Sequence, residues 1–378
     1  MTLVRTTHRT GTHRVCAPEE TWERVRPLLR RAGITRVADL TWMDDIGIPI
    51  FQAVRPMSRS LSVSQGKGVT AMHSRVSAVM ESFEVFHAED PVPSTVRASA
   101  EEVRADLTYD PRTLHLRDPT LFHEAMVLDW FPARVLGGDR DSLVPTAVVN
   151  MDTRVDGRLR PLVFHRNSNG LASGNTLDEA TAHALYETIE RDCHATARNL
   201  ADGGIPRIDP MSLRDDSRVL ASQFLSARAT VEIRDVTNDM RVPCFQVRVW
   251  SPTYPVICFG AGCHSDPQVA MCRALTEAAQ SRATAISGTR EDIEGSVWTS
   301  LQRHTVPEPH PTGTHAVRSL DDVAVPWVSD SMEEDVARLG DRVAAYTGVR
   351  PLAVDLTRPD FAIPVVKVLC PGMRVYMP

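Results

Sequence analysis

The sequence predicts an α+β fold of mixed sheets and helices, because short apolar segments alternate with longer segments of helical periodicity. Four short segments rich in β-branched and aromatic residues are typical of strands: residues 49–55, 145–153, 243–251 and 255–262. Three longer segments place apolar residues along one side at helical spacing: residues 75–89, 178–199 and 266–285. The interleaving of the two kinds of segment along the chain indicates mixed α and β structure.

The three predicted helices share one arrangement of polar residues. In each helix, polar side chains recur at positions i, i+4 and i+7, which lie on one face. They are Ser77, Glu81 and Glu84; His183, Glu187 and Glu190; and Arg273, Glu277 and Gln280. The opposite sides carry apolar residues for burial, and Ala, Ser, Thr and Met dominate the flanks. We therefore expect these helices to lie in the interior and to face a shared polar pocket.

A glycine-containing turn precedes each of these helices. The turns are Gly66-Lys67-Gly68, Gly174-Asn175 and Gly260-Ala261-Gly262. Glycine allows the backbone to approach a phosphate closely, and a helix N-terminus offers free N–H groups to an anion. Thr176 with Glu179, and Asp266 with Pro267, mark two of the helix starts. The turns favour a phosphate ligand, although none of them is a Walker A or GxGxxG motif.

Glu187 and Glu190 lie three positions apart on one helix face, where like charges destabilise a helix by about 0.2–0.5 kcal/mol. The residues alone leave two interpretations open. Acidic pairs most often form a solvated face. A buried pair instead needs a cation, because an unpaired buried carboxylate costs several kcal/mol. Hard oxygen ligands beside phosphate-binding turns suit Mg²⁺, so the second interpretation predicts that these carboxylates help to bind Mg-ATP.

The remaining segments complete one predicted domain. Residues 90–112, rich in charge, Pro and Ala, are expected to form a peripheral excursion with one helix near Ser99 to Asp106. The prolines of residues 304–315 indicate a linker. A helix around Met332 to Tyr346 and two strands, residues 351–357 and 363–369, are expected after it.

Composition excludes several function classes. A net charge of −6 and a pI near 6.1 give no basic surface for nucleic acid or for an anionic membrane. No signal peptide and no run of about 18 apolar residues is present. Seven cysteines without CxxC spacing are typical of a reduced, cytoplasmic protein. Neither Cys258, Cys263 and His264 nor Cys193 with His194 has the spacing of a metal site or a nucleophile, so we expect these residues to serve packing.

Only two of the 42 basic residues are lysines, Lys67 and Lys367. A chain that uses arginine elsewhere can keep a lysine where a compact, mobile ammonium is needed. Lys67 lies between two glycines and is predicted to contact a phosphate; the alternative is chance. Lys367, in a predicted strand, is expected to tolerate replacement by arginine.

The three signature segments closely resemble the YcaO family, which uses ATP to activate peptide backbone amides. They are residues 62–84, "NGLASGNTLDEATAHALYETIERD" and "GAGCHSDPQVAMCRALTEAAQSR", within a resemblance that runs from residue 11 to residue 372. The matching positions are Ser77, Glu81 and Glu84; Asn175, Glu179, Glu187, Glu190 and Arg191; and Glu277, Gln280 and Arg282, whereas Val85 replaces the usual arginine of the first element. The resemblance implies a YcaO-type fold with an internal ATP and Mg²⁺ site in a single catalytic domain, residues 1–378.

The resemblance also implies roles for individual residues. Magnesium would be held by Glu81, Glu84, Glu187 and Glu190. The nucleotide would contact Lys67, Ser77, Asn175, Glu179, Arg191, Glu277, Gln280 and Arg282. No general base is evident, and proton transfer is left to a pocket carboxylate or to the substrate.

The chemistry implied by the resemblance is O-phosphorylation of a backbone amide in a ribosomally made precursor peptide. Azoline-forming members generally end in a PxPxP tail, and many carry a fused E1-like or ocin-ThiF-like domain, whereas this chain ends in "PGMRVYMP". The long opening resembles YcaO proteins that form thioamides with a separate TfuA protein, here expected to supply sulfur. An azoline- or amidine-forming cyclodehydratase and an ATP-binding accessory protein without peptide chemistry are the alternatives. A homodimer is compatible with the sequence.

Overall fold

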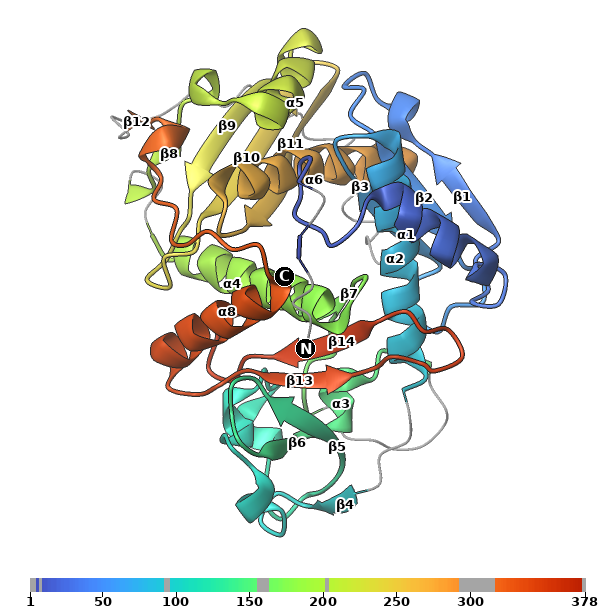
Figure 1. Cartoon of the computed structure of the whole chain (residues 1–378), viewed down its shortest axis with the longest axis vertical. Coiled ribbons are helices and arrows are strands. Elements are labelled where there is room, and N and C mark those ends of the chain that lie inside the picture. Colours follow the sequence, from blue (N-terminus) through green and yellow to red (C-terminus); the bar gives the residue numbers. More distant parts are fainter. Residues whose placement is uncertain are drawn as a thin grey trace.

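The computed structural model describes residues 5–6, 9–91, 96–154, 163–200, 204–291 and 317–375, and it confirms a fold of mixed sheets and helices (Figure 1). Three sheets surround a group of long helices. One sheet contains β1 (Arg36–Asp39), β2 (Ile50–Val54) and β3 (Val63–Lys67). A five-stranded sheet has the order β11 (Tyr254–Cys263), β10 (Cys244–Ser251), β9 (Thr230–Asp235), β8 (Arg207–Ile208) and β12 (Val317–Arg318).

The six-stranded sheet joins distant parts of the chain. Its order is β4 (Val96–Ser99), β5 (Val127–Val135), β13 (Leu352–Asp355), β14 (Val365–Leu369) and β7 (Leu171–Ser173), with β6 (Asp141–Pro145) paired to β5. Neighbouring strands of all three sheets are antiparallel except β8 and β12. The two strands predicted near the C-terminus, β13 and β14, therefore lie at the centre of this sheet.

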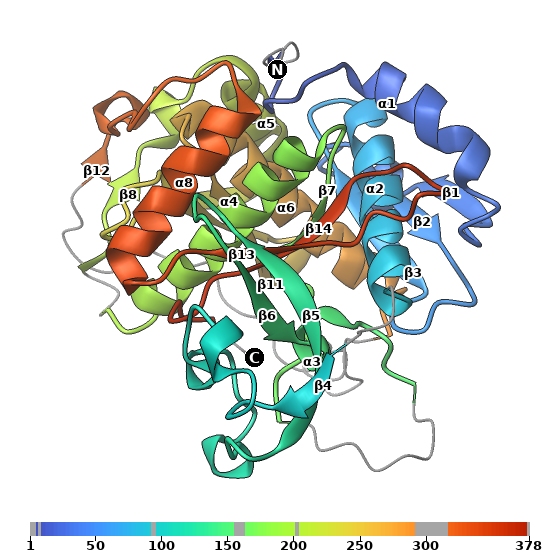
Figure 2. The same cartoon turned by 60° about the horizontal axis from the view of Figure 1, so that its bottom comes forward.

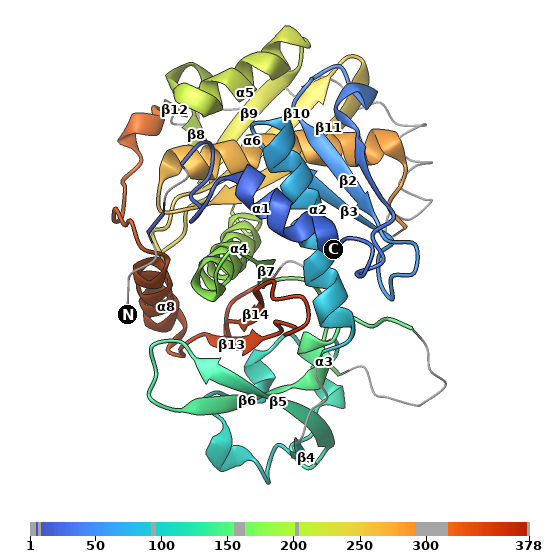
Figure 3. The ribbon, with the colours of Figure 1, turned by 45° about the vertical axis from the view of Figure 1, so that its right-hand side comes forward.

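The long helices are α1 (Pro18–Val25), α2 (Ala71–Glu89), α4 (Leu177–Ala197), α5 (Asp215–Ser226), α6 (Pro267–Ser287) and α8 (Met332–Thr347). Helices α2, α4 and α6 lie at the centre of the molecule, and the other helices pack around them (Figure 1). Figures 2 and 3 show α2 against β1–β3, α6 against the five-stranded sheet, and α4 between α8 and the strands β7 and β14. The predicted helix near residues 332–346 is confirmed as α8, which ends at the left-handed Gly348 (φ 79°).

The three signature helices are built in the same way. Each follows the terminal strand of one sheet: α2 follows β3, α4 follows β7 and α6 follows β11. Their N-caps agree with the sequence, since the side chain of Thr176 accepts from the Glu179 amide and that of Asp266 accepts from the Gln268 amide.

The glycines before these helices serve helix–strand packing. A Cβ on Gly66 would lie 2.1 Å from the backbone of α2, and a Cβ on Gly260 would lie 2.1 Å from the backbone of α6. Gly66 and Gly260 lie within β3 and β11. Their lack of a side chain therefore brings strand and helix backbones together, where the sequence had suggested approach to a phosphate.

Two local predictions are wrong. Residues 145–153 were expected to form a strand, but β6 ends at Pro145 and the short helix α3 (Thr146–Val149) follows, because burial of Val148 and Val149 outweighs their β propensity. A helix was expected near Ser99 to Asp106, but Ser99 ends β4 and only a 3₁₀ turn, Arg104–Asp106, is helical. There Glu102 accepts hydrogen bonds from the amide and hydroxyl of Ser99, which fixes a turn in place of a regular helix.

The predicted linker at residues 304–315 lies outside the described residues. Within the described ranges, no helix combines the length and apolar character that crossing a membrane would need.

Candidate active site

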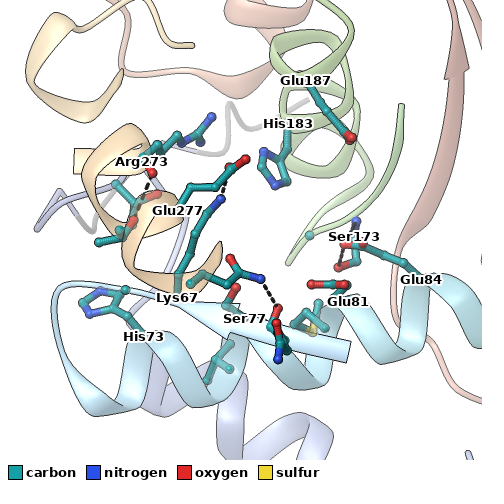
Figure 4. Close-up of a pocket in the computed structure, with 18 of the residues that line it drawn as sticks. Lys67, His73, Ser77, Glu81, Glu84, Ser173, His183, Glu187, Arg273 and Glu277 are labelled. Atoms are coloured by element: carbon teal, nitrogen blue, oxygen red, sulfur yellow. Dashed lines mark hydrogen bonds and ion pairs between the residues drawn. The ribbon is translucent and has the colours of Figure 1, made fainter. Parts of the chain in front are cut away.

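The polar faces of α2, α4 and α6 line one cavity of about 670 Å³ (Figure 4). Its lining includes all nine residues of the repeated i, i+4, i+7 pattern: Ser77, Glu81, Glu84, His183, Glu187, Glu190, Arg273, Glu277 and Gln280. Lys67, Asn175, Glu179 and Arg191 also line it. The volume is in the range of small-molecule sites. The structure therefore brings eleven of the twelve predicted site residues to one cavity, and only Arg282 lies elsewhere.

One side of the cavity is acidic. Glu81 and Glu84 project from α2, and Glu187 projects from α4 toward the same space (Figure 4). The carboxylate of Glu84 accepts hydrogen bonds from the amide and hydroxyl of Ser173, at 2.8 and 2.7 Å. Arg191 lies 3.6 Å from Glu187 and 3.7 Å from Glu190. One arginine is thus shared by two of the four carboxylates.

Burial makes these carboxylates difficult to ionise without a ligand. It raises the pKa of Glu81 to about 7, that of Glu84 to about 8 and that of Glu190 to about 7. Burial also raises the pKa of Glu187, which Arg191 opposes. The carboxylates repel one another, so each ionisation makes the next one harder. A bound cation would relieve both the burial cost and the repulsion.

The opposite side carries cations. Lys67, at the end of β3, donates a hydrogen bond to Glu277 of α6 (Figure 4). Although burial opposes ionisation, Lys67 and Arg191 lower the pKa of Glu277. Arg273, one turn before Glu277, donates to the Cys263 carbonyl at 3.1 Å, and burial lowers its pKa to about 10. The cavity is therefore polarised, with positive groups facing an acidic wall.

Sequence reasoning missed two charged residues of the lining, Arg14 and Arg290. Arg273 was expected on the polar face of its helix, but no role was assigned to it. Arg14 comes from the N-terminal segment, and no local pattern links it to the helices. Arg290 follows α6 and lowers the pKa of Glu81, which burial raises. It brings positive charge to the cavity that Val85 also lines.

Glu179 and Asn175 form hydrogen bonds that connect the N-terminal segment to the start of α4 at the cavity wall. Glu179, 2% exposed, accepts from the Val15 amide at 2.9 Å and from Arg14 at 3.2 Å. It also accepts from the Asn175 amide at 3.1 Å, and the Asn175 side-chain oxygen accepts from the Thr21 hydroxyl at 2.8 Å. These bonds fasten the N-terminal segment over the start of α4.

Arg282 does not reach the cavity. It is 1% exposed, and its guanidinium donates to Asp44 at 2.8 and 2.9 Å, to Asp45 at 3.1 Å and to Ser251 at 2.9 Å. The reason is angular: five residues after Glu277, at about 100° per residue, Arg282 lies about 140° around α6 from it. It ties α6 to the loop after β1, and the geometry gives no support to the prediction of nucleotide contact.

The donor set of the cavity fits magnesium that arrives with a nucleotide. Among the residues that the structure describes, no group of three or more His, Cys, Asp or Glu side chains is arranged to hold a metal by itself. Mg²⁺ typically uses one or two carboxylates and takes its other ligands from phosphates and water. Carboxylates on α2 and α4, facing cations on β3 and α6, offer such a partial set.

Comparison with known proteins is consistent with this geometry. A family model described as YcaO cyclodehydratase, ATP- and Mg²⁺-binding, matches residues 65–374. An uncharacterised protein of Mycobacterium tuberculosis H37Rv is 42% identical over 371 residues, covering 97% of this chain and 83% of that protein. A Rhizobium leguminosarum bv. trifolii protein, described as uncharacterised and in the tfuA 3′ region, is 32% identical, with 96% of this chain and 89% of that protein covered.

Two solved structures share the fold. YcaO from Methanopyrus kandleri, bound with AMPPCP and Mg²⁺, has a TM-score of 0.76 and 22% identity, covering 100% of this chain and 99% of that one. A heterocyclase in complex with substrate and cofactor has a TM-score of 0.78 and 24% identity; the match covers 98% of this chain and 55% of the heterocyclase. The extent of the family match and of the sequence identity shows that this chain belongs to the YcaO family, whose members bind ATP and Mg²⁺.

Proposed function

We propose that this chain phosphorylates the oxygen of a peptide backbone amide with ATP and gives a thioamide in a ribosomally made peptide. The observation that carries the proposal is the polarised cavity, where four carboxylates of α2 and α4 line the same space as the Lys67–Glu277 pair. The sulfur product is supported by the tfuA 3′ region relative, which is 32% identical over 96% of this chain. A TfuA-like partner would deliver the sulfur.

The reaction exchanges oxygen for sulfur. A hydrosulfide adds to the amide carbonyl carbon, and the carbonyl oxygen becomes an oxyanion. This oxygen attacks the γ-phosphorus of ATP, and ADP leaves. The carbon–oxygen bond then breaks, inorganic phosphate departs with the former amide oxygen, and loss of the sulfur proton gives the thioamide.

The chain's own residues would position the reactants and neutralise charge, which is the main task in phosphoryl transfer. Glu81, Glu84, Glu187 and Glu190 fit Mg²⁺, which when bound neutralises phosphate charge. Lys67 and Arg191 place fixed positive charge in the same cavity, where it opposes the negative charge that develops on the oxygens. The N-terminal segment held by Glu179 closes the wall beside them.

Azoline formation is the second candidate. It is favoured by the family description as cyclodehydratase and by the structural similarity to a heterocyclase, although this chain spans only 55% of that protein. In this reaction a substrate side chain replaces hydrosulfide, and the same amide oxygen leaves as phosphate. An accessory role without peptide chemistry would use the same nucleotide cavity.

Mass spectrometry separates the three functions. The purified chain is incubated with Mg-ATP, sulfide, a TfuA-like protein and a precursor peptide encoded beside it, and Glu187→Gln serves as the matched inactive control. We expect a peptide mass gain of about 16 Da, as oxygen-to-sulfur exchange requires, whereas cyclodehydration removes about 18 Da. A loss of about 18 Da would establish the azoline reaction. ATP turnover that never changes the peptide would contradict the proposal.

A further inference from the structure

The second lysine of the chain, which the sequence places in a strand and predicts to tolerate arginine, is a buried residue in the structure. Lys367 lies on β14 and is 1% exposed. Its ammonium donates hydrogen bonds to the carbonyl oxygens of Asn167 and Asn169, at 2.7 and 2.8 Å. Burial lowers the pKa of Lys367 to about 8, and Glu187 acts in the opposite direction. A buried amine with these two contacts has a specific structural task.

That task concerns the loop of residues 167–170, which precedes β7. Lys367 binds two of its carbonyl groups, and the amide of Val368 donates to a third, that of Gly170, at 2.7 Å. The fourth carbonyl, that of Ser168, accepts from the Leu171 amide at 2.8 Å. Gly170 has φ 73°, and a Cβ there would lie 2.2 Å from the Val368 oxygen. All four carbonyls are thus fixed, three of them by β14.

The loop packs against α4 beside Glu187: a Cβ on Gly170 would lie 3.0 Å from the side chain of Thr188, the next residue along the helix. Burial raises the pKa of this carboxyl, and the groups that lower it are Arg191, Lys367 and the backbone amide of Gly170. Arg191 lies on the helix itself, 3.6 Å away, whereas Lys367 and Gly170 belong to the strand and loop packed against α4. Ser168 of the same loop lines the cavity. Groups on β14 and in the loop, outside α4, therefore favour the ionised form of Glu187.

We propose that Lys367 is a positioning residue for Glu187: its ammonium fixes the loop 167–170 from within, so that the Gly170 amide and a buried positive charge hold this carboxylate toward the cavity. The inference rests on the proposed nucleotide site but not on the identity of the product. A compact ammonium suits two carbonyls in a closed space, whereas the planar guanidinium of arginine is larger and presents its donors in a rigid fork. This explains why a chain so rich in arginine has lysine here.

Because the chain has only two lysines, it can report on this arrangement without a substitution. In the NMR spectrum of protein labelled with ¹³C at lysine Cε, Lys67 and Lys367 give two signals. The signal that is missing from the spectrum of Lys67→Arg belongs to Lys67. A non-hydrolysable ATP analogue with Mg²⁺ should shift both signals. With the analogue and EDTA, the Lys67 signal should still move, while the Lys367 signal should return to its position in the free protein.

The possible outcomes are distinct. If the Lys67 signal shifts with Mg²⁺ and nucleotide while the Lys367 signal does not, the inference is overturned. The nucleotide site would then still stand. If neither signal shifts at saturating ligand, both the proposed nucleotide site and the inference are overturned. A Mg²⁺ response of Lys367 that is lost in Glu187→Gln would support it.

A pair of variants separates positioning from general stability. Lys367→Met removes the ammonium and should weaken Mg²⁺ affinity in the presence of nucleotide by about 10–100-fold, the usual effect of losing a group that orients a metal ligand. Val144→Ala is the control, because Val144 is equally buried in the same sheet but lies on β6 and does not line the cavity. It should lower the melting temperature and leave Mg²⁺ affinity unchanged. Unchanged Mg²⁺ affinity in folded Lys367→Met would refute the proposal. If this variant does not fold, the lysine signals of the labelled wild-type protein decide the question.

Discussion

Replacing Glu190 by glutamine should stabilise the ligand-free protein at pH 8, although the change removes a charge from the functional cavity. The Glu190 side chain is 10% exposed, and its cationic neighbour Arg191 is 3.7 Å away. Burial and the nearby Glu277 raise the pKa of Glu190 to about 7. At pH 8 the folded protein therefore holds an ionised carboxylate in a place that disfavours it, and glutamine relieves this cost while keeping size and hydrogen-bonding capacity.

The size of the effect follows from linkage. A folded-state pKa raised from 4.5 to about 7 means that the folded protein retains a proton that the unfolded chain releases, so stability falls as pH rises through this window. The corresponding free energy is about 3 kcal/mol at most. Unfolding entropies of about 2.1 cal/mol/K per residue give about 0.8 kcal/mol/K for 378 residues, so a gain of 1–3 kcal/mol raises Tm by about 1–4 °C.

The assay is thermal melting of wild type and Glu190→Gln at pH 8 and pH 5 without ligand. The gain should be full at pH 8 and fall to about a quarter of that at pH 5, where Glu190 is protonated in the folded protein but mostly ionised in the unfolded chain. Glu89→Gln is the matched control: Glu89 is 3% exposed, and hydrogen bonds from Arg55 and Ser58, at 2.7 and 2.6 Å, outweigh burial and lower its pKa. This variant should melt lower than wild type at pH 8. A Glu190→Gln protein that melts at or below wild type at pH 8 would refute the reasoning.

Three further predictions concern single contacts. Saturating Mg-ATP at about 100 times its dissociation constant should add about 2.7 kcal/mol of stability, seen as a higher Tm in a melt with ligand than without. Lys67→Arg should reduce ATP turnover about tenfold or more and lower Tm by about 2–4 °C, because a hydrogen bond to a charged group is worth about 1.5–3 kcal/mol and the fork of arginine cannot reproduce the Lys67–Glu277 contact. Arg282→Met should lower the free energy of unfolding, measured with denaturant, by about 3–5 kcal/mol, because it leaves the Asp44 carboxylate without its Arg282 partner. The affinity of the folded Arg282→Met protein for Mg-ATP, measured by calorimetry, should not change.

Most of the predicted site residues that line the cavity could be identified from helical periodicity. The spacing i, i+4, i+7 decides which residues share a face, so Glu81 and Glu84 could be grouped before the structure was known, and so could Glu187 and Glu190. The same geometry argues against Arg282, since five residues turn it away from Glu277. The motif position alone does not say which way the helix presents this side chain.

Other features of the site depend on contacts that no local pattern contains. Arg14 meets Glu179 across 165 positions of sequence, and Lys367 meets the carbonyls of Asn167 and Asn169 across about 200. Packing also decides the conformation of the short apolar segment at 145–153, where the single turn of α3 buries Val148 and Val149. Gly66 and Gly260 could be recognised as special in the sequence, but only the structure shows that a helix backbone occupies the space.

The central claim is that α2 and α4 present carboxylates to a metal that arrives with ATP, and anomalous scattering tests it most directly. Crystals grown with a non-hydrolysable ATP analogue and Mn²⁺ in place of Mg²⁺ would locate each metal independently of the protein coordinates. We predict manganese peaks within coordination distance of at least one of Glu81 and Glu84 and at least one of Glu187 and Glu190, with the phosphates between them and Lys67. Manganese and nucleotide bound outside this cavity, or metal that contacts none of these glutamates, would contradict the account.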